Sequence, residues 1–203
     1  MRGGSFLYLM YKRAYVWDKL NAEERKACMD MGEDYKAFLN ESKTERRCAA
    51  EIIRRAKEAG FVCICEKKEL KAGDKVYYNN RGKAVMLSVI GSEPLENGMN
   101  IVGSHIDSPR LDIKQNPVYE AGGTTLLKTH YYGGVKKYQW VALPLALYGV
   151  IVKSNGEKVE IAVGDKCGDP VFYISDLLPH LANDQMSKTM SEGVEGESLN
   201  ILI

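Results

Sequence analysis

The chain has 203 residues, of which 45% are hydrophobic and 27% are charged, with 28 Lys and Arg against 27 Asp and Glu. This length suits one ordinary domain or two small ones, and the composition excludes the disordered, collagenous and low-complexity classes of protein. The net charge of +1 gives no basic excess for phosphate contacts, so we expect no nucleic-acid partner.

The apolar stretches are short. Phe6–Met10 is shorter than a signal-peptide core of about 7–15 residues. Val141–Val152 falls well below the ~20 residues that a membrane span requires. The sequence therefore predicts no export signal and no membrane partner.

Five cysteines are scattered along the chain, an odd number without the spacing of a disulfide framework. Cys63 and Cys65 could form half of a metal site. Free thiols fit them better, because no second Cys/His pair lies at zinc-finger spacing. Together with the missing export signal, this cysteine usage predicts a cytoplasmic protein.

The first sixty residues predict helices. Asn21-Ala22-Glu23-Glu24 has the form of a capping box, so we expect one helix from there to about Met31 and another over Glu33–Asn40. Ser42-Lys43-Thr44-Glu45 is a second capping box, and apolar residues follow it at helical spacing. Gly60, at the C′ position, is expected to end this third helix.

Strand signals follow. Three short β-rich segments are expected as strands: 61–65, 75–78 and 84–90. The turn residues Asn79-Asn80-Arg81-Gly82 should join the last two as a hairpin. After a loop over 91–98, Asn100–Ser104 has the composition of a buried strand that ends at His105.

The character of the sequence changes from Gln115 onward. Glycines occur in pairs, and turn signals such as Ser154-Asn155-Gly156-Glu157 recur. These features favour an all-β module with one short helix near Ile174–Leu181. We place a domain boundary near Asn116, with one domain over 1–116 and the other over 117–203.

One constellation could carry chemistry. The expected strand at 100–104 delivers His105 and, two residues later, Asp107 to its carboxyl end, where open α/β sheets bind ligands. Imidazole is a good zinc ligand, and a nearby carboxylate can orient its ring. On this spacing alone, a His satisfied by a neighbouring Asp is the more frequent outcome.

Longer motifs surround this pair. They are HIDSPRLDIKQNPVYE at 105–120, LLKTHYYGGVKKYQW at 126–140, YKAFLNESKTER at 35–46 and DPVFYISDLLPHLA at 169–182. Together they closely resemble the aspartyl aminopeptidase and aminopeptidase I family of metallopeptidases, which are co-catalytic dizinc exopeptidases. The resemblance covers essentially residues 11–203 and does not include residues 1–10.

The resemblance implies an α/β fold. This is a three-layer α/β/α zinc-peptidase catalytic domain, present here as its N-terminal part, with an inserted β-rich lid and dimerisation domain from about Glu120. It also implies that His105 ligates one of two bridged zinc ions, or Co²⁺ or Mn²⁺. Asp107 is then the catalytic residue that supports it. His180 is implied to reach across a dimer interface into the partner's active site, although a surface histidine is the simpler reading of that residue alone.

The other residues that such a site needs do not follow His105. The family implies a bridging Asp, a Glu-Glu pair, a further Asp and a final His downstream of the lid. The only Glu-Glu doublet, Glu23-Glu24, lies in an expected first helical turn, where the helix dipole explains it. We therefore expect this chain alone to be inactive.

Three interpretations of function remain. The first is the N-terminal part of a metalloaminopeptidase that hydrolyses N-terminal residues from peptides and forms a homo-oligomer, a dimer through the lid or a dodecamer. The second is a non-catalytic oligomerisation or regulatory module that retains only the lid interface. The third is a mononuclear metal protein that uses His105 with carboxylates from a partner chain.

Overall fold

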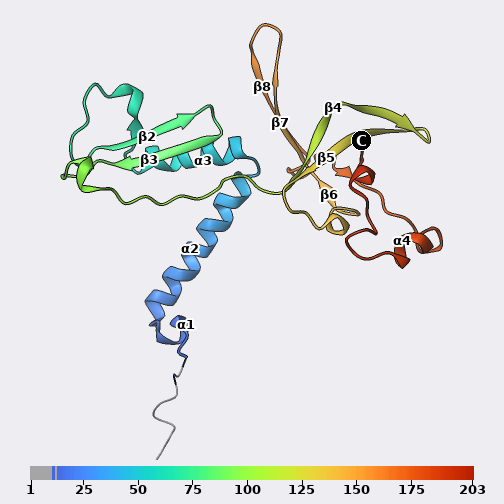
Figure 1. Ribbon diagram of the computed structural model, residues 1–203, viewed down its shortest axis with the longest axis horizontal. Helices are drawn as coiled ribbons and strands as arrows, with labels where there is room; N and C mark the ends of the chain where they lie inside the picture. The colour runs from blue at the N-terminus through green and yellow to red at the C-terminus, as the bar shows by residue number, and fades with distance from the viewer. Residues whose placement is uncertain (1–10, 12) are drawn as a thin grey trace, which may run out of the picture.

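The computed structural model describes residue 11 and residues 13–203, which form two lobes (Figure 1). The N-terminal lobe holds α1 (Val16–Lys19), α2 (Ala22–Glu41), α3 (Glu45–Glu58) and a small sheet, and the second lobe is built mainly of strands. Residues 98–109, which form no helix or strand, connect the lobes. Within the N-terminal lobe, helix α2 projects away from the small sheet and from the second lobe (Figure 1).

Helix α2 begins where the sequence predicts but is not divided. Asn21 Oδ1 accepts a hydrogen bond from Glu24 N at 2.9 Å, and Glu24 Oε2 accepts one from Asn21 N at 2.8 Å, which confirms the capping box. The expected break between Met31 and Glu33 is wrong. Gly32 between them costs only ~1 kcal/mol relative to Ala in a helix interior, and the 20-residue helix tolerates it.

Helix α3 has the predicted apolar face and the predicted end. Its N-cap is Thr44, whose Oγ1 accepts from Arg47 N at 3.3 Å, whereas Ser42 is the C-cap of α2. Cys48 and Ala49 are buried on its inner face. Gly60 has a φ of +85°, so the reversal of the chain after α3 uses the left-handed conformation that favours glycine.

Glu51 is a buried carboxylate on α3. It accepts hydrogen bonds from Arg54 at 2.7 Å and from Arg55 at 2.8 Å. The Arg54 bond lowers the pKa of Glu51 to about 2, with a further contribution from Arg55, although burial acts in the opposite direction. The carboxylate is therefore ionised in the folded lobe across the ordinary pH range.

We expect Glu51→Gln to lower the free energy of unfolding by about 1–3 kcal/mol at pH 7. The folded-state pKa lies below the ordinary value of 4.5. The contribution of the carboxylate is therefore complete above about pH 4.5 and is lost as the pH falls toward 2. Urea unfolding at pH 7 and pH 3 should show a smaller difference between wild type and variant at pH 3. An equal difference between wild type and variant at both pH values would contradict this role. The control is Glu58→Gln, which removes an exposed partner of Arg54.

The small sheet has the order β1-β2-β3. Its strands are β1 (Val62–Cys63), β2 (Lys75–Asn80) and β3 (Ala84–Val89), with β1 parallel and β3 antiparallel to β2. The β2–β3 hairpin is confirmed, and its turn has Arg81 and Gly82 at positive φ while Asn79 Oδ1 accepts from Gly82 N at 2.8 Å. The strand expected over 61–65 is shorter than predicted, because Ile64–Glu66 forms a 3₁₀ turn. Helix α3 packs against β2 and β3.

The buried strand expected over Asn100–Ser104 is absent from the described structure. Ile101 is 79% exposed and Val102 is 99% exposed, and neither takes part in a described strand pair. A buried strand needs a neighbouring strand to satisfy its backbone groups. The described part of the chain offers none here, since β1, β2 and β3 pair only with one another.

The second lobe is an antiparallel sheet with a separate hairpin. The sheet has the order β4-β5-β10-β9-β6. Its strands are β4 (Arg110–Ala121), β5 (Thr124–Tyr132), β6 (Pro144–Leu145), β9 (Phe172–Tyr173) and β10 (Ile201–Leu202). Strands β7 (Leu147–Val152) and β8 (Lys158–Val163) form a hairpin that projects from this lobe (Figure 1). The predicted turn at Ser154–Glu157 joins the two strands.

The core of this lobe lies beside β5 and β10. Its buried members are Leu127, Ile174, Val194, Leu199 and Ile201. The helix expected near 174–181 lies later in the chain, as a 3₁₀ turn over Pro179–Leu181 followed by α4 (Asn183–Ser187). Residue 116 lies inside β4, whose pairing with β5 shifts register between Ile113 and Val118.

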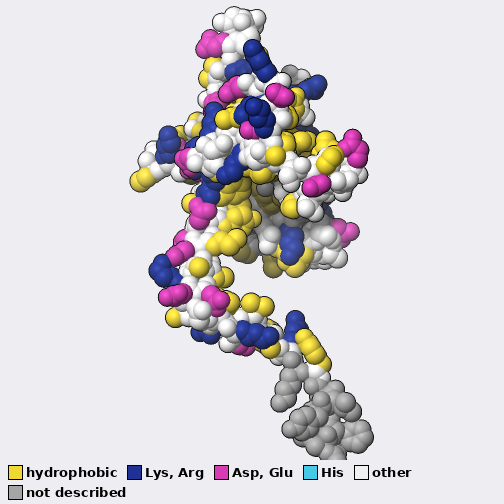
Figure 2. Space-filling view, turned by 90° about the vertical axis from the view of Figure 1, so that its left-hand side faces the viewer, with side chains coloured by type: hydrophobic (Ala, Val, Ile, Leu, Met, Phe, Trp, Pro, Cys, Tyr) yellow, Lys and Arg dark blue, Asp and Glu magenta, His cyan; other side chains and the backbone are white. Residues whose placement is uncertain are grey.

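The chain is less compact than a globular monomer. Its accessible surface is 16453 Å², whereas a compact monomer of this length exposes about 9500 Å². Figure 2 shows hydrophobic side chains on the projecting N-terminal helices. No helix in the described ranges combines the length and the apolar character needed to cross a bilayer.

Candidate functional site

His105 and Asp107 lie in the connecting segment just before β4. His105 Nδ1 is 2.9 Å from the carbonyl oxygen of Asp107 and 3.1 Å from its Oδ1. Because both neighbours are acceptors, Nδ1 carries a hydrogen, and in the neutral ring Nε2 then keeps its lone pair. The imidazole is 84% exposed, so this lone pair is accessible to a metal ion.

The other oxygen of Asp107 is held by the second lobe. Tyr132, at the end of β5, donates its hydroxyl hydrogen to Asp107 Oδ2 at 3.1 Å. This bond lowers the pKa of Asp107 below its ordinary value, with smaller contributions from the Asp107 backbone N–H and from His105, although burial acts in the opposite direction. The same bond raises the pKa of Tyr132. Asp107 is therefore a carboxylate with one oxygen on the imidazole and the other on a phenol.

Arg110 supports Tyr132 from the first residue of β4. Its guanidinium carbon lies 4.1 Å from the centre of the Tyr132 ring, within cation–π distance. Arg110 Nε donates to Asp112 at 2.7 Å, and Nη1 forms an ion pair with Glu45 of α3 at 2.8 Å. Burial opposes the charge of Arg110, but these acids outweigh it and raise the pKa. Arg110 thus connects Tyr132 to α3.

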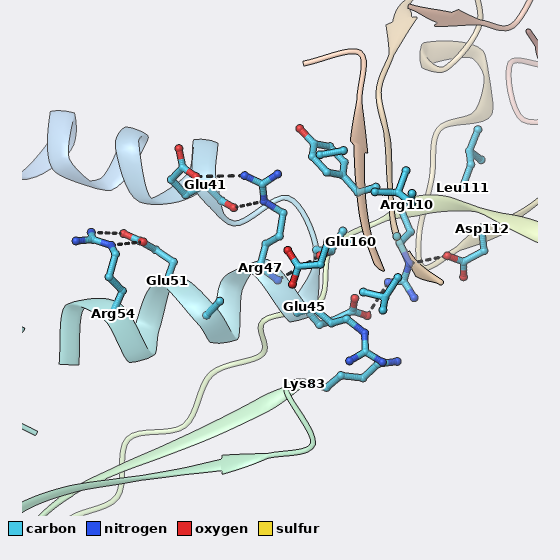
Figure 3. Close-up of a pocket in the computed structure, with 18 residues that line it drawn as sticks. Glu41, Glu45, Arg47, Glu51, Arg54, Lys83, Arg110, Leu111, Asp112 and Glu160 are labelled. Carbon is cyan, nitrogen blue, oxygen red and sulfur yellow. Dashed lines mark hydrogen bonds and ion pairs between the residues drawn. The ribbon is translucent and has the colours of Figure 1, made fainter. Parts of the chain in front are cut away.

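A cavity of about 540 Å³ lies between the lobes, lined by residues of α3, β4, β7 and β8 (Figure 3). Arg47 at its wall lies 3.2 Å from Glu41 and 3.9 Å from Asp165, and its guanidinium faces the Tyr148 ring at 4.9 Å. Burial, together with a 2.6 Å hydrogen bond to Asp165, raises the pKa of Tyr148 to about 12. Neither residue of the His105 pair lines this cavity. Its contacts join the two lobes.

His180 lies apart from the pair. It is an exposed residue of the Pro179–Leu181 turn. Within residue 11 and residues 13–203, no hydrogen bond or ion pair joins it to His105 or Asp107. The structure therefore brings together two of the three residues proposed from the sequence, and the described residues show no contact of this kind between them and the third.

The donor set of the pair fits one ligand of a zinc site. An imidazole with a free Nε2 and a carboxylate on Nδ1 is the usual arrangement around a zinc-binding histidine. Across the described residues, no group of three or more His, Cys, Asp or Glu side chains is placed to hold a metal ion. Among the described residues, His105 is therefore a single candidate ligand, with Asp107 as its candidate support.

The sequence alone did not single out Tyr132 or Arg110. Tyr132 belongs to the YYGG stretch and Arg110 to the HIDSPR stretch, but neither carries a function by its residue type. The signal that unites them is strand register, since Arg110 pairs directly with Tyr132 across β4 and β5. That register depends on an irregularity between Ile113 and Val118 that spacing does not predict.

Comparison with known proteins identifies relatives over most of the chain. The family profile described as aminopeptidase I zinc metalloprotease (M18) matches residues 38–203. A protein of Clostridium acetobutylicum named as an M18 family aminopeptidase 1 is 51% identical over 197 residues, which is 95% of this chain and 42% of that protein.

Solved structures give the same relationship. The M18 aminopeptidase of Thermotoga maritima superposes with a TM-score of 0.86 at 42% identity, over 95% of this chain and 42% of that one. Aminopeptidase I of Clostridium acetobutylicum gives a TM-score of 0.82 at 46% identity, over 96% of this chain and 43% of that one. The chain thus has the mixed helix and sheet structure of the segment of these M18 aminopeptidases with which it superposes.

The chain spans about 42% of the length of these relatives. The family profile nevertheless covers most of it, and the resemblance noted in the sequence motifs is confirmed. The chain belongs to the M18 family of aminopeptidase I zinc metalloproteases.

Proposed function

We propose that this chain is the N-terminal part of a zinc-dependent aminopeptidase that hydrolyses N-terminal residues from peptides. The observation that carries the proposal is the His105–Asp107 pair, with Nδ1 held by the carboxylate and Nε2 free. It occurs in a chain of a family described as zinc metalloproteases. The remaining ligands are then contributed from outside the described residues.

His105 and Asp107 have separate tasks in this mechanism. His105 presents Nε2 as a neutral metal ligand, and Asp107 holds the Nδ1 hydrogen, which fixes the ring orientation and makes Nε2 more basic. A pair of zinc ions, when bound, polarises the scissile carbonyl and lowers the pKa of a bound water. Co²⁺ or Mn²⁺ suits similar ligands. Asp107 is a carboxylate near neutral pH, and the Tyr132 bond lowers its pKa further below the ordinary value.

The proposed whole enzyme has a three-layer α/β/α catalytic domain, begun by residues 1–116, and a lid and dimerisation domain begun by 117–203. The uncovered apolar side chains of Ile101 and Val102 support a catalytic sheet that is only begun in these residues. They are suited to a strand that is completed by sheet partners from the remainder of the catalytic domain. The expected strand over 100–104 then forms only in that context.

The proposed assembly is a homo-oligomer, a dimer through the lid or a dodecamer, in which His180 enters the active site of the partner. Leu178 and Leu181, on either side of His180, are 59% and 65% exposed. Exposed apolar side chains around one polar residue are typical of an interface. We place the enzyme in the cytoplasm, which agrees with five cysteines that are all free.

The proposal is tested by producing residues 1–203 and the protein at its full encoded length, and measuring bound zinc and release of N-terminal residues from peptides. We expect zinc and activity in the longer protein and neither in residues 1–203. A full-length protein that oligomerises without zinc or peptidase activity would instead indicate a non-catalytic module. Stoichiometric zinc in residues 1–203 alone would favour the mononuclear alternative.

A further inference from the structure

Tyr132 of the β-rich lobe contacts the segment that carries the proposed metal ligand, residues 105–109. It is the last residue of β5 and pairs with Arg110, the first residue of β4, only three positions after Asp107. The strand ladder therefore places the Tyr132 hydroxyl beside the carboxylate, at 3.1 Å from Oδ2. The lobe proposed as a lid therefore makes a direct hydrogen bond to Asp107, the residue that supports His105.

Two neighbouring features restrict the position of the Tyr132 ring. Arg110 lies 4.1 Å from the ring centre and is itself held by Asp112 and Glu45. Gly133 follows with a φ of +78°, and a Cβ built on it would lie 3.7 Å from the Cα of Pro109. The chain therefore turns back against the ligand segment immediately after the tyrosine, which limits where its hydroxyl can point.

The bond from Tyr132 ties the Asp107 carboxylate to strand β5. Its Oδ1 and its carbonyl oxygen both face the imidazole of His105, which is itself largely exposed. In the part of the chain that the structure describes, the Tyr132 bond is the one side-chain hydrogen bond that joins the Asp107 carboxylate to a residue beyond His105. Without it, the His105–Asp107 pair has no side-chain support from a regular element.

We propose that Tyr132 is a positioning residue. Acting from the β-rich lobe, it fixes the Asp107 carboxylate and thereby aims Nε2 of His105 at the metal. This inference rests on the proposed aminopeptidase function. It makes the geometry of a catalytic-domain ligand depend on a strand of the lid, so displacement of β5 weakens the metal site even though the ligand itself is unchanged.

The test uses Tyr132→Phe in the protein at its full encoded length. Phenylalanine keeps the ring beneath Arg110 and removes only the hydroxyl. Because Tyr132 acts on His105 only through Asp107, we expect kcat to fall about 10-fold with KM unchanged, the lower end of the range for residues that support a metal ligand. Zinc should be lost to a competing chelator at a chelator concentration about 10-fold lower. The matched control is Tyr131→Phe, the same change one residue earlier, where the described residues include no hydrogen-bond partner for the hydroxyl. Wild-type kcat and zinc affinity in Tyr132→Phe would overturn the proposal.

A double-mutant cycle of Tyr132→Phe and Asp107→Ala tests the Tyr132–Asp107 contact independently of the proposed aminopeptidase function. If Tyr132 acts through Asp107, Tyr132→Phe should lower the Tm of the zinc-free protein but have no further effect in the Asp107→Ala background. Additive shifts in Tm would overturn the proposed contact. If the wild type neither binds zinc nor cleaves peptides, the aminopeptidase proposal fails, and the Tm cycle alone then decides whether Tyr132 holds Asp107.

Discussion

His105→Ala should abolish zinc binding at one metal position and lower kcat/KM by more than about 100-fold in the protein at its full encoded length. Loss of a residue that only supports a metal ligand typically costs 10–100-fold, so loss of the ligand itself should cost at least the upper end of that range. Zinc content by elemental analysis and initial rates on a peptide substrate measure the two effects.

Two further variants make the interpretation specific. Asp107→Asn keeps the size of the side chain but removes the charge that accepts from Nδ1 at 3.1 Å, so we expect an intermediate loss of about 10–100-fold. His130→Ala removes an exposed imidazole of β5 that faces Tyr131 and should leave activity within about twofold. Equal losses in His105→Ala and His130→Ala would contradict the assignment of the ligand.

The local structure of this chain was predictable where short-range chemistry decides it. The capping box at Asn21 and the Gly60 stop both occur as predicted, because each depends on residues within a few positions of one another. The β2–β3 hairpin follows from the turn chemistry at 79–82 in the same way. The undivided α2 shows the limit, since one glycine does not stop a helix whose flanking residues favour it.

The site was only half predictable for a related reason. His105 and Asp107 are two residues apart, so their contact follows from local geometry. Tyr132 is 25 positions from Asp107 and meets it only through the β4–β5 ladder. His180 carries no local contact that could assign it a role, and its proposed place in a partner's active site depends on an assembly.

The exposed apolar side chains before His105 also depend on residues far away in the chain. The predicted strand over Asn100–Ser104 depends on sheet neighbours, and its apolar side chains are uncovered where those neighbours are absent from the described residues. The accessible surface of the chain, which exceeds that of a compact monomer of this length, also fits elements that lack the neighbours that would cover them. An apolar stretch thus predicts burial correctly only when the partner that buries it is present.

The effect of Val102→Asp on the free energy of unfolding should therefore differ between residues 1–203 and the protein at its full encoded length. In residues 1–203, where Val102 is 99% exposed, the change should alter the free energy of unfolding by less than about 0.5 kcal/mol and should reduce aggregation, because an apolar side chain becomes charged. In the protein at its full encoded length, the proposed strand buries this position. A buried, unpaired carboxylate there should cost at least about 3 kcal/mol.

Denaturant unfolding of both lengths, with and without the substitution, measures this difference directly. Val102→Ile is the matched control, because it keeps a β-branched apolar side chain and should be tolerated at either length. A neutral Val102→Asp in the longer protein would show that the segment before His105 remains uncovered there. His105 would then not lie at the end of a sheet strand, and its position would depend on Asp107 and Tyr132 alone.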